Sequence, residues 1–125
     1  MSNLPDGVSE LDFSAALEQF RATVEAQWVF YNDEDVALYR DDYSPLKDQP
    51  AERLASAAVA PSNVEEVQAV VRIANRYRIP LYAISTGRNL GYGGAAPAMT
   101  GSVVLDLKRM NRILAIDEDR ITCRT

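Results

Sequence analysis

The stretch from Ser85 to Gly101, STGRNLGYGGAAPAMTG, has the composition of a binding loop. Five of the six glycines lie in it, and the other is Gly7, near the start of the chain. Glycine tolerates positive φ and lets other groups approach the backbone, at an entropic cost, so a run this dense indicates that the backbone itself is used for binding. Successive backbone N–H groups can hold an anion, and Arg88 adds a cationic donor. The stretch therefore predicts a phosphate or pyrophosphate site.

Two common phosphate motifs do not account for this stretch. The Walker pattern ends in Gly-Lys followed by Ser or Thr, and the stretch contains no lysine. Gly91, Gly93 and Ala96 nominally satisfy the dinucleotide fingerprint, but Pro97 follows at once and no helical apolar stripe begins there. What remains is a glycine loop that runs from one strand to another and holds its anion by backbone alone.

The loop and its flanking strands carry a longer pattern. It consists of residues 79–97, IPLYAISTGRNLGYGGAAP, then residues 101–107, GSVVLDL, and then Met110-Asn111-Arg112. This pattern resembles the flavin-binding segment of the vanillyl-alcohol oxidase and p-cresol methylhydroxylase family. The resemblance runs from Leu11 to about Asp117, which corresponds to the N-terminal part of a family chain.

The resemblance implies FAD as the cofactor and, in a complete family enzyme, oxidation of a 4-alkylphenol. Tyr92 matches the family tyrosine that contacts the phenolic oxygen of the substrate, where its hydroxyl favours substrate ionisation. Electrons would then pass to a cytochrome c subunit or to oxygen, and the full-length enzyme would be a homo-oligomer. The residues expected to hold FAD are Ser85, Thr86, Gly87, Arg88, Asn89, Leu90, Gly91, Gly93 and Gly94.

Composition limits the other possibilities. A chain of 125 residues with 47% apolar residues can bury one modest core. The net charge of −5 and the scattered basic residues give no electrostatic footprint for nucleic acid or an anionic membrane. With no histidine and a single cysteine, Cys123, neither a metal cluster nor an internal disulfide is expected. No apolar run has the length of a membrane helix and no signal peptide is evident, so we expect a cytoplasmic location, with the periplasm as the alternative.

The first 54 residues are expected to form a helical or capping region. Ser9 can cap a helix that reaches about Gln27 and buries one apolar face. A short strand at 28–31 and an acidic helical segment at 34–40 follow. The polar residues 41–52 are predicted to form a solvated surface excursion. The apolar face of the helix consists of Phe13, Leu17, Phe20 and Val24.

Residues 55–125 are expected to form the first, incomplete part of the FAD-binding domain. A strand at 55–60, a helix from a capping box of Ser62 and Glu65 to Tyr77, and a strand at 81–85 form a right-handed crossover with parallel strands. The glycine loop then leaves the carboxyl end of the second strand, where α/β sheets bind ligands. Strands at 103–107 and 112–117 complete an α+β fold with a small, mostly parallel sheet and flanking helices.

Alternatives remain open at several points. The residues after Asp117 depart from the family pattern, which suggests truncation, a frameshifted end or a gene fragment. The chain is then either the FAD-binding segment of an oxidoreductase or a non-enzymatic remnant that binds a nucleotide without turnover. The glycines also suit a tight crossing of strands, and Arg88 suits bracing of the loop. The tyrosines predicted to serve ordinary packing are Tyr31, Tyr39, Tyr43, Tyr77 and Tyr82.

Overall fold

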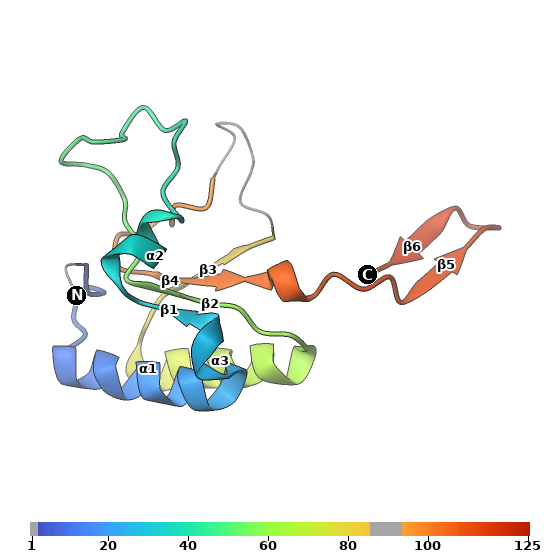
Figure 1. The fold of residues 1–125 in the computed structure, drawn as a ribbon, viewed down its shortest axis with the longest axis horizontal. Coiled ribbons are helices and arrows are strands. Elements are labelled where there is room, and N and C mark those ends of the chain that lie inside the picture. The colour runs from blue at the N-terminus through green and yellow to red at the C-terminus, as the bar shows by residue number, and fades with distance from the viewer. Residues whose placement is uncertain (1–2, 86–93) are drawn as a thin grey trace.

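The structure, a computed structural model, describes residues 3–85 and 94–125. Its centre is a 4-stranded sheet in the order β1-β2-β4-β3 (Figure 1). Strands β2, β3 and β4 are parallel, and β1 pairs with β2 in the antiparallel sense. The predicted small, mostly parallel sheet is therefore confirmed. The strands are β1 (Val29–Phe30), β2 (Ala57–Val59), β3 (Leu81–Ile84) and β4 (Val103–Asp106).

The two strands of the predicted crossover, β2 and β3, are parallel but not adjacent. Strand β4 lies between them, with Val104 opposite Ala58 on one side and Tyr82 on the other. All of β4 is buried, as expected of a strand that is paired on both edges and covered on both faces.

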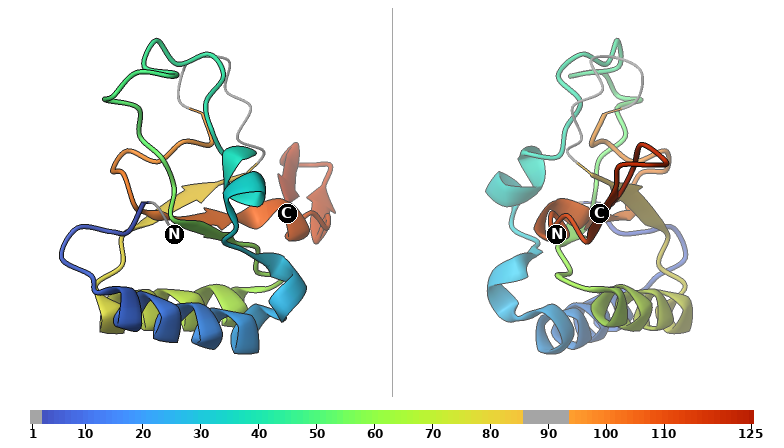
Figure 2. Two further views of the ribbon diagram at one scale, coloured as in Figure 1. Left: turned by 60° about the vertical axis from the view of Figure 1, so that its left-hand side comes forward. Right: turned by 90° about the vertical axis from the view of Figure 1, so that its right-hand side faces the viewer.

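Two long helices cover one face of the sheet. Helix α1 (Glu10–Val24) and helix α3 (Val64–Tyr77) lie side by side below it (Figures 1 and 2). The Ser9 side chain accepts a hydrogen bond from the Asp12 N–H, so the predicted cap of α1 is confirmed. The helix ends at Val24 and not near Gln27, because Glu25 takes a non-helical φ of 71°. A short 3₁₀ helix at Ala26–Trp28 follows.

The predicted cap of α3 is wrong by one residue. The cap is Asn63, whose side chain accepts from the Glu66 N–H at 2.8 Å. The Glu66 carboxylate in turn accepts from the Ser62 N–H at 2.7 Å. Asn63 takes the capping role predicted for Ser62, because asparagine is also a favourable N-cap residue and directly precedes the first residue of the helix.

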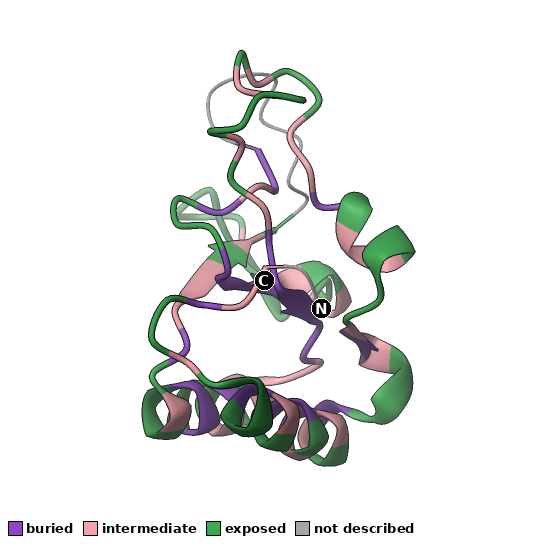
Figure 3. Cartoon of the chain, turned by 90° about the vertical axis from the view of Figure 1, so that its left-hand side faces the viewer, coloured by how far each residue is buried: buried purple, intermediate pink, exposed green. Residues whose placement is uncertain are grey.

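The opposite face of the sheet carries a second, smaller core. Residues of β4 alternate between the two faces: Val103 and Leu105 pack toward the helices, and Val104 packs toward this second core. Figure 3 shows the buried strands between the helices and the overlying loops. The short helix α2 (Asp33–Ala37) and the segment 41–53 lie on this side. The second core consists of Tyr39, Ala55, Ala58, Ala95 and Val104.

The last residues form a separate hairpin of β5 (Ala115–Asp117) and β6 (Thr122–Arg124), which projects from the body (Figure 1). The predicted strand at 112–117 is therefore shorter and lies outside the main sheet, and β6 was not predicted. A 3₁₀ helix at Leu107–Arg109 precedes the hairpin. None of the described helices has the length and apolar character that crossing a membrane requires. The division of the chain at residues 54 and 55 stays a prediction.

Candidate functional site

Ser85 and Gly94 are the described residues that border the predicted FAD loop. Ser85 directly follows β3 and is exposed, whereas Gly94 is buried on the return path. The loop therefore leaves the carboxyl end of a parallel strand, as expected for a ligand-binding loop. The other predicted site residues lie outside the described residues, and their roles stay predictions: Thr86, Gly87, Arg88, Asn89, Leu90, Gly91, Tyr92 and Gly93.

Both stems of the loop are anchored in the second core. Ala95, just after the loop, is buried in it, and Ile84, just before the loop, packs against it. Tyr39 belongs to the same core. The loop is thus supported by a packed cluster at both ends, which limits how far its ends can separate.

A polar network lies beside this core, at the carboxyl end of β4. The Tyr39 hydroxyl donates to Asp106 Oδ2 at 2.8 Å. Lys108 Nζ lies 3.1 Å from the same oxygen and donates to the Tyr39 oxygen at 3.3 Å. The ammonium also lies 4.5 Å from the centre of the Phe30 ring. Burial and the Asp106 carboxylate both raise the pKa of Tyr39 well above its usual range, so its phenol stays a neutral donor.

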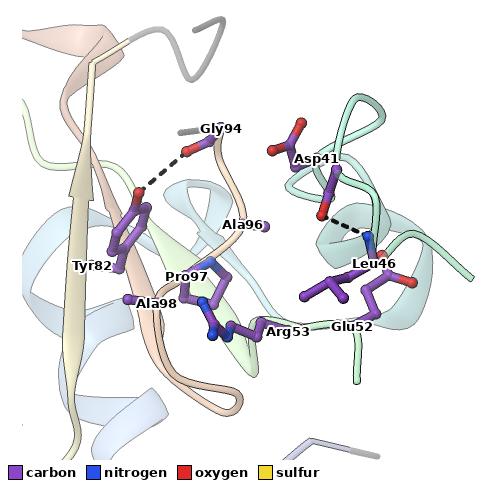
Figure 4. Close-up of a pocket in the computed structure, with 10 residues that line it drawn as sticks. Asp41, Leu46, Glu52, Arg53, Tyr82, Gly94, Ala96, Pro97 and Ala98 are labelled. Atoms are coloured by element: carbon purple, nitrogen blue, oxygen red, sulfur yellow. Dashed lines mark hydrogen bonds between the residues drawn. The ribbon is translucent and has the colours of Figure 1, made fainter. Parts of the chain in front are cut away.

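Gly94 lies in close contact with the 41–53 segment. A Cβ added at Gly94 would lie 2.6 Å from Asp41 Cγ, so the absence of a side chain allows this approach. From the other side, the Tyr82 hydroxyl donates to the Gly94 carbonyl at 3.5 Å (Figure 4). The end of the glycine loop is therefore held between β3 and the 41–53 segment.

A cleft of about 210 Å³ lies between the 41–53 segment, residues 94–98 and Tyr82 (Figure 4). The sequence predicted a solvated excursion at 41–52, ordinary packing for Tyr82 and cofactor binding for Gly94, and nothing in the local pattern indicates that these positions meet. Only the tertiary fold brings them together. The cleft is lined by Asp41, Ser44, Leu46, Glu52, Arg53, Tyr82, Gly94, Ala96, Pro97 and Ala98.

One of the two acidic side chains in the cleft is already neutralised. Arg40 donates two hydrogen bonds to the Glu52 carboxylate, from Nε at 2.7 Å and from one terminal nitrogen at 2.6 Å. The hydrogen bonds from Arg40 hold the pKa of Glu52 below its usual range. Within residues 3–85 and 94–125, the Asp41 carboxylate accepts a hydrogen bond only from the Tyr43 N–H, at 3.0 Å, and Arg53 forms no ion pair. The cleft thus offers one cation and one carboxylate.

The described residues fit a large anionic cofactor such as FAD. The loop begins at a strand's carboxyl end, and its far end, Gly94, packs closely against Asp41. Arg53, which forms no ion pair with the residues that the structure describes, lines the same cleft as Gly94. Residues 3–85 and 94–125 contain no cluster of side chains that could hold a metal ion. The arrangement can therefore bind and orient a cofactor, whereas the redox chemistry would come from that cofactor.

Comparison with known proteins gives a consistent family and fold. Residues 55–125 match a family model described as FAD binding domain. The chain is 43% identical to the 4-cresol dehydrogenase [hydroxylating] flavoprotein subunit of Pseudomonas putida, over 93% of this chain and 22% of that protein. A substrate-bound crystal structure of p-cresol methylhydroxylase superimposes with a TM-score of 0.87 at 43% identity, again over 93% and 22% of the two chains.

A second solved structure gives the same fold. The 4-ethylphenol oxidase from Gulosibacter chungangensis, solved with isoeugenol, superimposes with a TM-score of 0.86 at 47% identity, over 93% of this chain and 22% of that one. The chain therefore spans about a fifth of the length of the relatives it matches.

Proposed function

The chain belongs to the FAD binding domain family, and from this premise we propose that it forms the pyrophosphate-binding part of the FAD site in an oxidoreductase that acts on 4-alkylphenols. Its cofactor is FAD. The observation that carries the proposal is the position of the glycine-rich stretch, whose first residue, Ser85, directly follows the carboxyl end of the parallel strand β3. Its residue Gly94 accepts a hydrogen bond from Tyr82 of the same strand. Similarity to proteins named for 4-cresol and 4-ethylphenol supports the substrate class.

In this proposal the chain's residues bind and orient, and FAD, when bound, supplies the hydride acceptor. The backbone N–H groups of residues 86–94 hold the pyrophosphate, with Arg88 as a charged donor. Tyr92 donates a hydrogen bond to the phenolic oxygen of the substrate and stabilises its ionised form. A cytochrome c subunit or oxygen as the final electron acceptor, and a homo-oligomeric complete enzyme, belong to the same proposal.

The test is a chimera in which this chain replaces the matching segment of the Pseudomonas putida flavoprotein subunit. We expect the chimera to retain FAD and to oxidise 4-cresol with an artificial electron acceptor. Tyr92→Phe removes one hydroxyl and keeps the ring, so FAD should remain bound while kcat/KM falls roughly ten- to a hundredfold, as expected for a lost charge-assisted hydrogen bond of about 1.5 to 3 kcal/mol.

Two outcomes would change the proposal. If Tyr92→Phe loses FAD but the remaining holoenzyme oxidises 4-cresol normally, Tyr92 belongs to the cofactor site and not to the substrate site. If the chimera retains FAD and oxidises no 4-alkylphenol, the chain is a nucleotide-binding segment without the proposed substrate class. Tyr43→Phe, at an exposed tyrosine, serves as the matched control.

A further inference from the structure

We propose that the projecting hairpin of β5 and β6 is a self-association surface, on which two copies of the chain pack the apolar faces of their hairpins together in opposite directions. The proposed function assigns no role to this hairpin, and its association does not depend on FAD. Three features of the hairpin carry the proposal: its isolation from the body, the different character of its two faces, and the separation of its charges along its length.

The rest of the molecule leaves the hairpin uncovered. It projects away from the sheet and the helices, and every residue from 111 to 125 except Asp117 is exposed (Figure 1). Within the described residues, the hydrogen bonds of segment 112–125 stay inside that segment, as does the one from the Leu114 N–H to the Arg124 carbonyl at 2.7 Å. A two-stranded hairpin on its own is marginally stable in water. A partner that covers it therefore also stabilises it.

One face of the hairpin is apolar. Ile116 lies opposite Cys123 in the register of the two strands, so their side chains share a face. Leu114 lies on the same face because side chains alternate along a strand, and Leu114 and Ile116 are 58% and 68% exposed. This alternation is typical of a sheet that buries one face. The opposite face carries Ala115, Asp117, Thr122 and Arg124.

The charges of the hairpin identify a second copy as the partner. Three carboxylates and one guanidinium lie around the tip, which is therefore acidic, whereas two guanidinium groups lie at the base, beside the body. A second hairpin that runs in the opposite direction places its acidic tip against the basic base of the first, and the same contact repeats at the other end. Hairpins that run in the same direction would bring like charges together. The tip residues are Asp117, Glu118, Asp119 and Arg120, and the base residues are Arg112 and Arg124.

The arrangement has two-fold symmetry, the commonest symmetry of protein dimers. An axis that crosses the strands at the middle of the apolar face sets Ile116 against Ile116 of the second copy, and Cys123 against Cys123. Packed sheets lie ~10 Å apart, and their facing side chains fill the space between them. The two thiols are therefore within reach of a short bifunctional reagent.

The experiment measures association of the purified chain by sedimentation equilibrium at several concentrations, where we expect an equilibrium of monomer and dimer. Ile116→Glu places a charge at the centre of the apolar face and should weaken the dimer by about tenfold or more. Its far-ultraviolet circular dichroism should keep the helical signal, because Ile116 is exposed and lies outside the main sheet. Leu11→Glu is the matched control, since it adds the same charge at a side chain of α1 that is 80% exposed, and it should leave dimerisation unchanged.

Charge reversal tests the direction of the hairpins. Glu118→Lys with Asp119→Lys makes the tip basic, and each such chain should dimerise about tenfold or more weakly, because tip and base then repel each other. Arg112→Glu with Arg124→Glu makes the base acidic and should have the same effect. An equimolar mixture of the two double variants should restore dimers, since opposite charges then meet at both ends. Double variants that dimerise as well as the unaltered chain would contradict the opposite direction of the hairpins.

Chemical cross-linking tests the contact itself. A short bis-maleimide should join two copies through Cys123, the single cysteine of the chain, and should fail to do so in Ile116→Glu. A monomer at every concentration overturns the proposal and leaves the apolar face to a different partner. Association that continues beyond the dimer, or that persists unchanged in Ile116→Glu, also overturns it, because the contact then lies elsewhere or is unspecific.

Discussion

At the scale of single residues, the hydrogen bond from Tyr39 to Asp106 is a buried polar contact of the second core, which also holds both stems of the glycine loop. The two side chains are 8% and 4% exposed, so Asp106 has little access to water as a replacement partner. A buried acceptor that loses its donor costs more than an exposed one, because its desolvation is no longer compensated. Tyr39 therefore does more than the packing that the sequence predicted for it.

Tyr39→Phe should lower the free energy of unfolding by about 1 to 3 kcal/mol, since it leaves Asp106 with Lys108 as its remaining charged partner. Urea denaturation followed by circular dichroism measures the change. Tyr43→Phe, at a side chain 69% exposed, is the matched control and should change stability by less than about 0.5 kcal/mol. Equal stability of both variants would show that the buried hydrogen bond contributes nothing net.

Gly101 requires the absence of a side chain for two reasons. Its φ is +84°, and an added Cβ would lie 2.5 Å from the Leu4 carbonyl oxygen, a backbone atom that cannot easily move. Gly101→Ala should therefore destabilise the fold by more than the ~1 kcal/mol expected from positive φ alone. Gly7→Ala measures the cost of positive φ without a steric clash, because Gly7 has φ +74° and nothing lies within 4 Å of its added Cβ. A denaturation midpoint that falls equally in both variants would argue against the steric contact.

At the scale of elements, the 41–53 segment is held in place by Arg40 and Glu52. Besides its two bonds from Arg40, the Glu52 carboxylate accepts the Asp48 N–H at 2.8 Å. Arg40 also contacts Asp48 at 2.6 Å. Arg40 thus links the two ends of the 41–53 segment, which explains how this segment keeps a defined conformation without regular secondary structure.

The contact between Arg40 and Glu52 should depend on pH. The pKa of Glu52 lies below the ordinary 4.5, first because of its hydrogen bonds from Arg40. A lowered pKa means that the contact stabilises the fold above about pH 4.5 and is lost as the pH falls through the pKa of the folded state. The Asp48 amide signal in NMR should titrate with a midpoint below 4.5, and in Arg40→Gln this midpoint should move up toward 4.5. An unchanged midpoint in Arg40→Gln would contradict the assignment.

The elements also show where sequence predicts structure and where it does not. The N-cap and the apolar face of α1 depend on residues about one turn apart, so Ser9 and Phe13 were predicted correctly. The order of the strands and the pairing of β1 with β2 depend on long-range packing, and local patterns do not encode them. The cleft was missed for the same reason, because Arg53 and Tyr82 carry no local signal that they share a wall.

At the scale of the whole molecule, one side of the sheet serves stability and the other carries the candidate site. The helices α1 and α3 supply most of the core on the first side. The loop stems, the cleft and the Tyr39–Asp106 contact lie on the second side. The glycine-rich stretch identified the family and its cofactor, FAD, from sequence, because a long specific string of residues can be matched without knowledge of the fold. The roles of residues 86–93 stay a prediction.

The most direct test of the central claim is the FAD affinity of the purified chain, compared with that of Gly91→Val and Gly93→Val. Valine disfavours positive φ and keeps an anion away from the backbone N–H groups. We predict saturable binding of FAD to the unaltered chain, competition by ADP, and loss of at least tenfold in affinity in both variants at unchanged melting temperature. Equal FAD affinity in the chain and in both valine variants would contradict the assignment of residues 86–93 as the pyrophosphate loop.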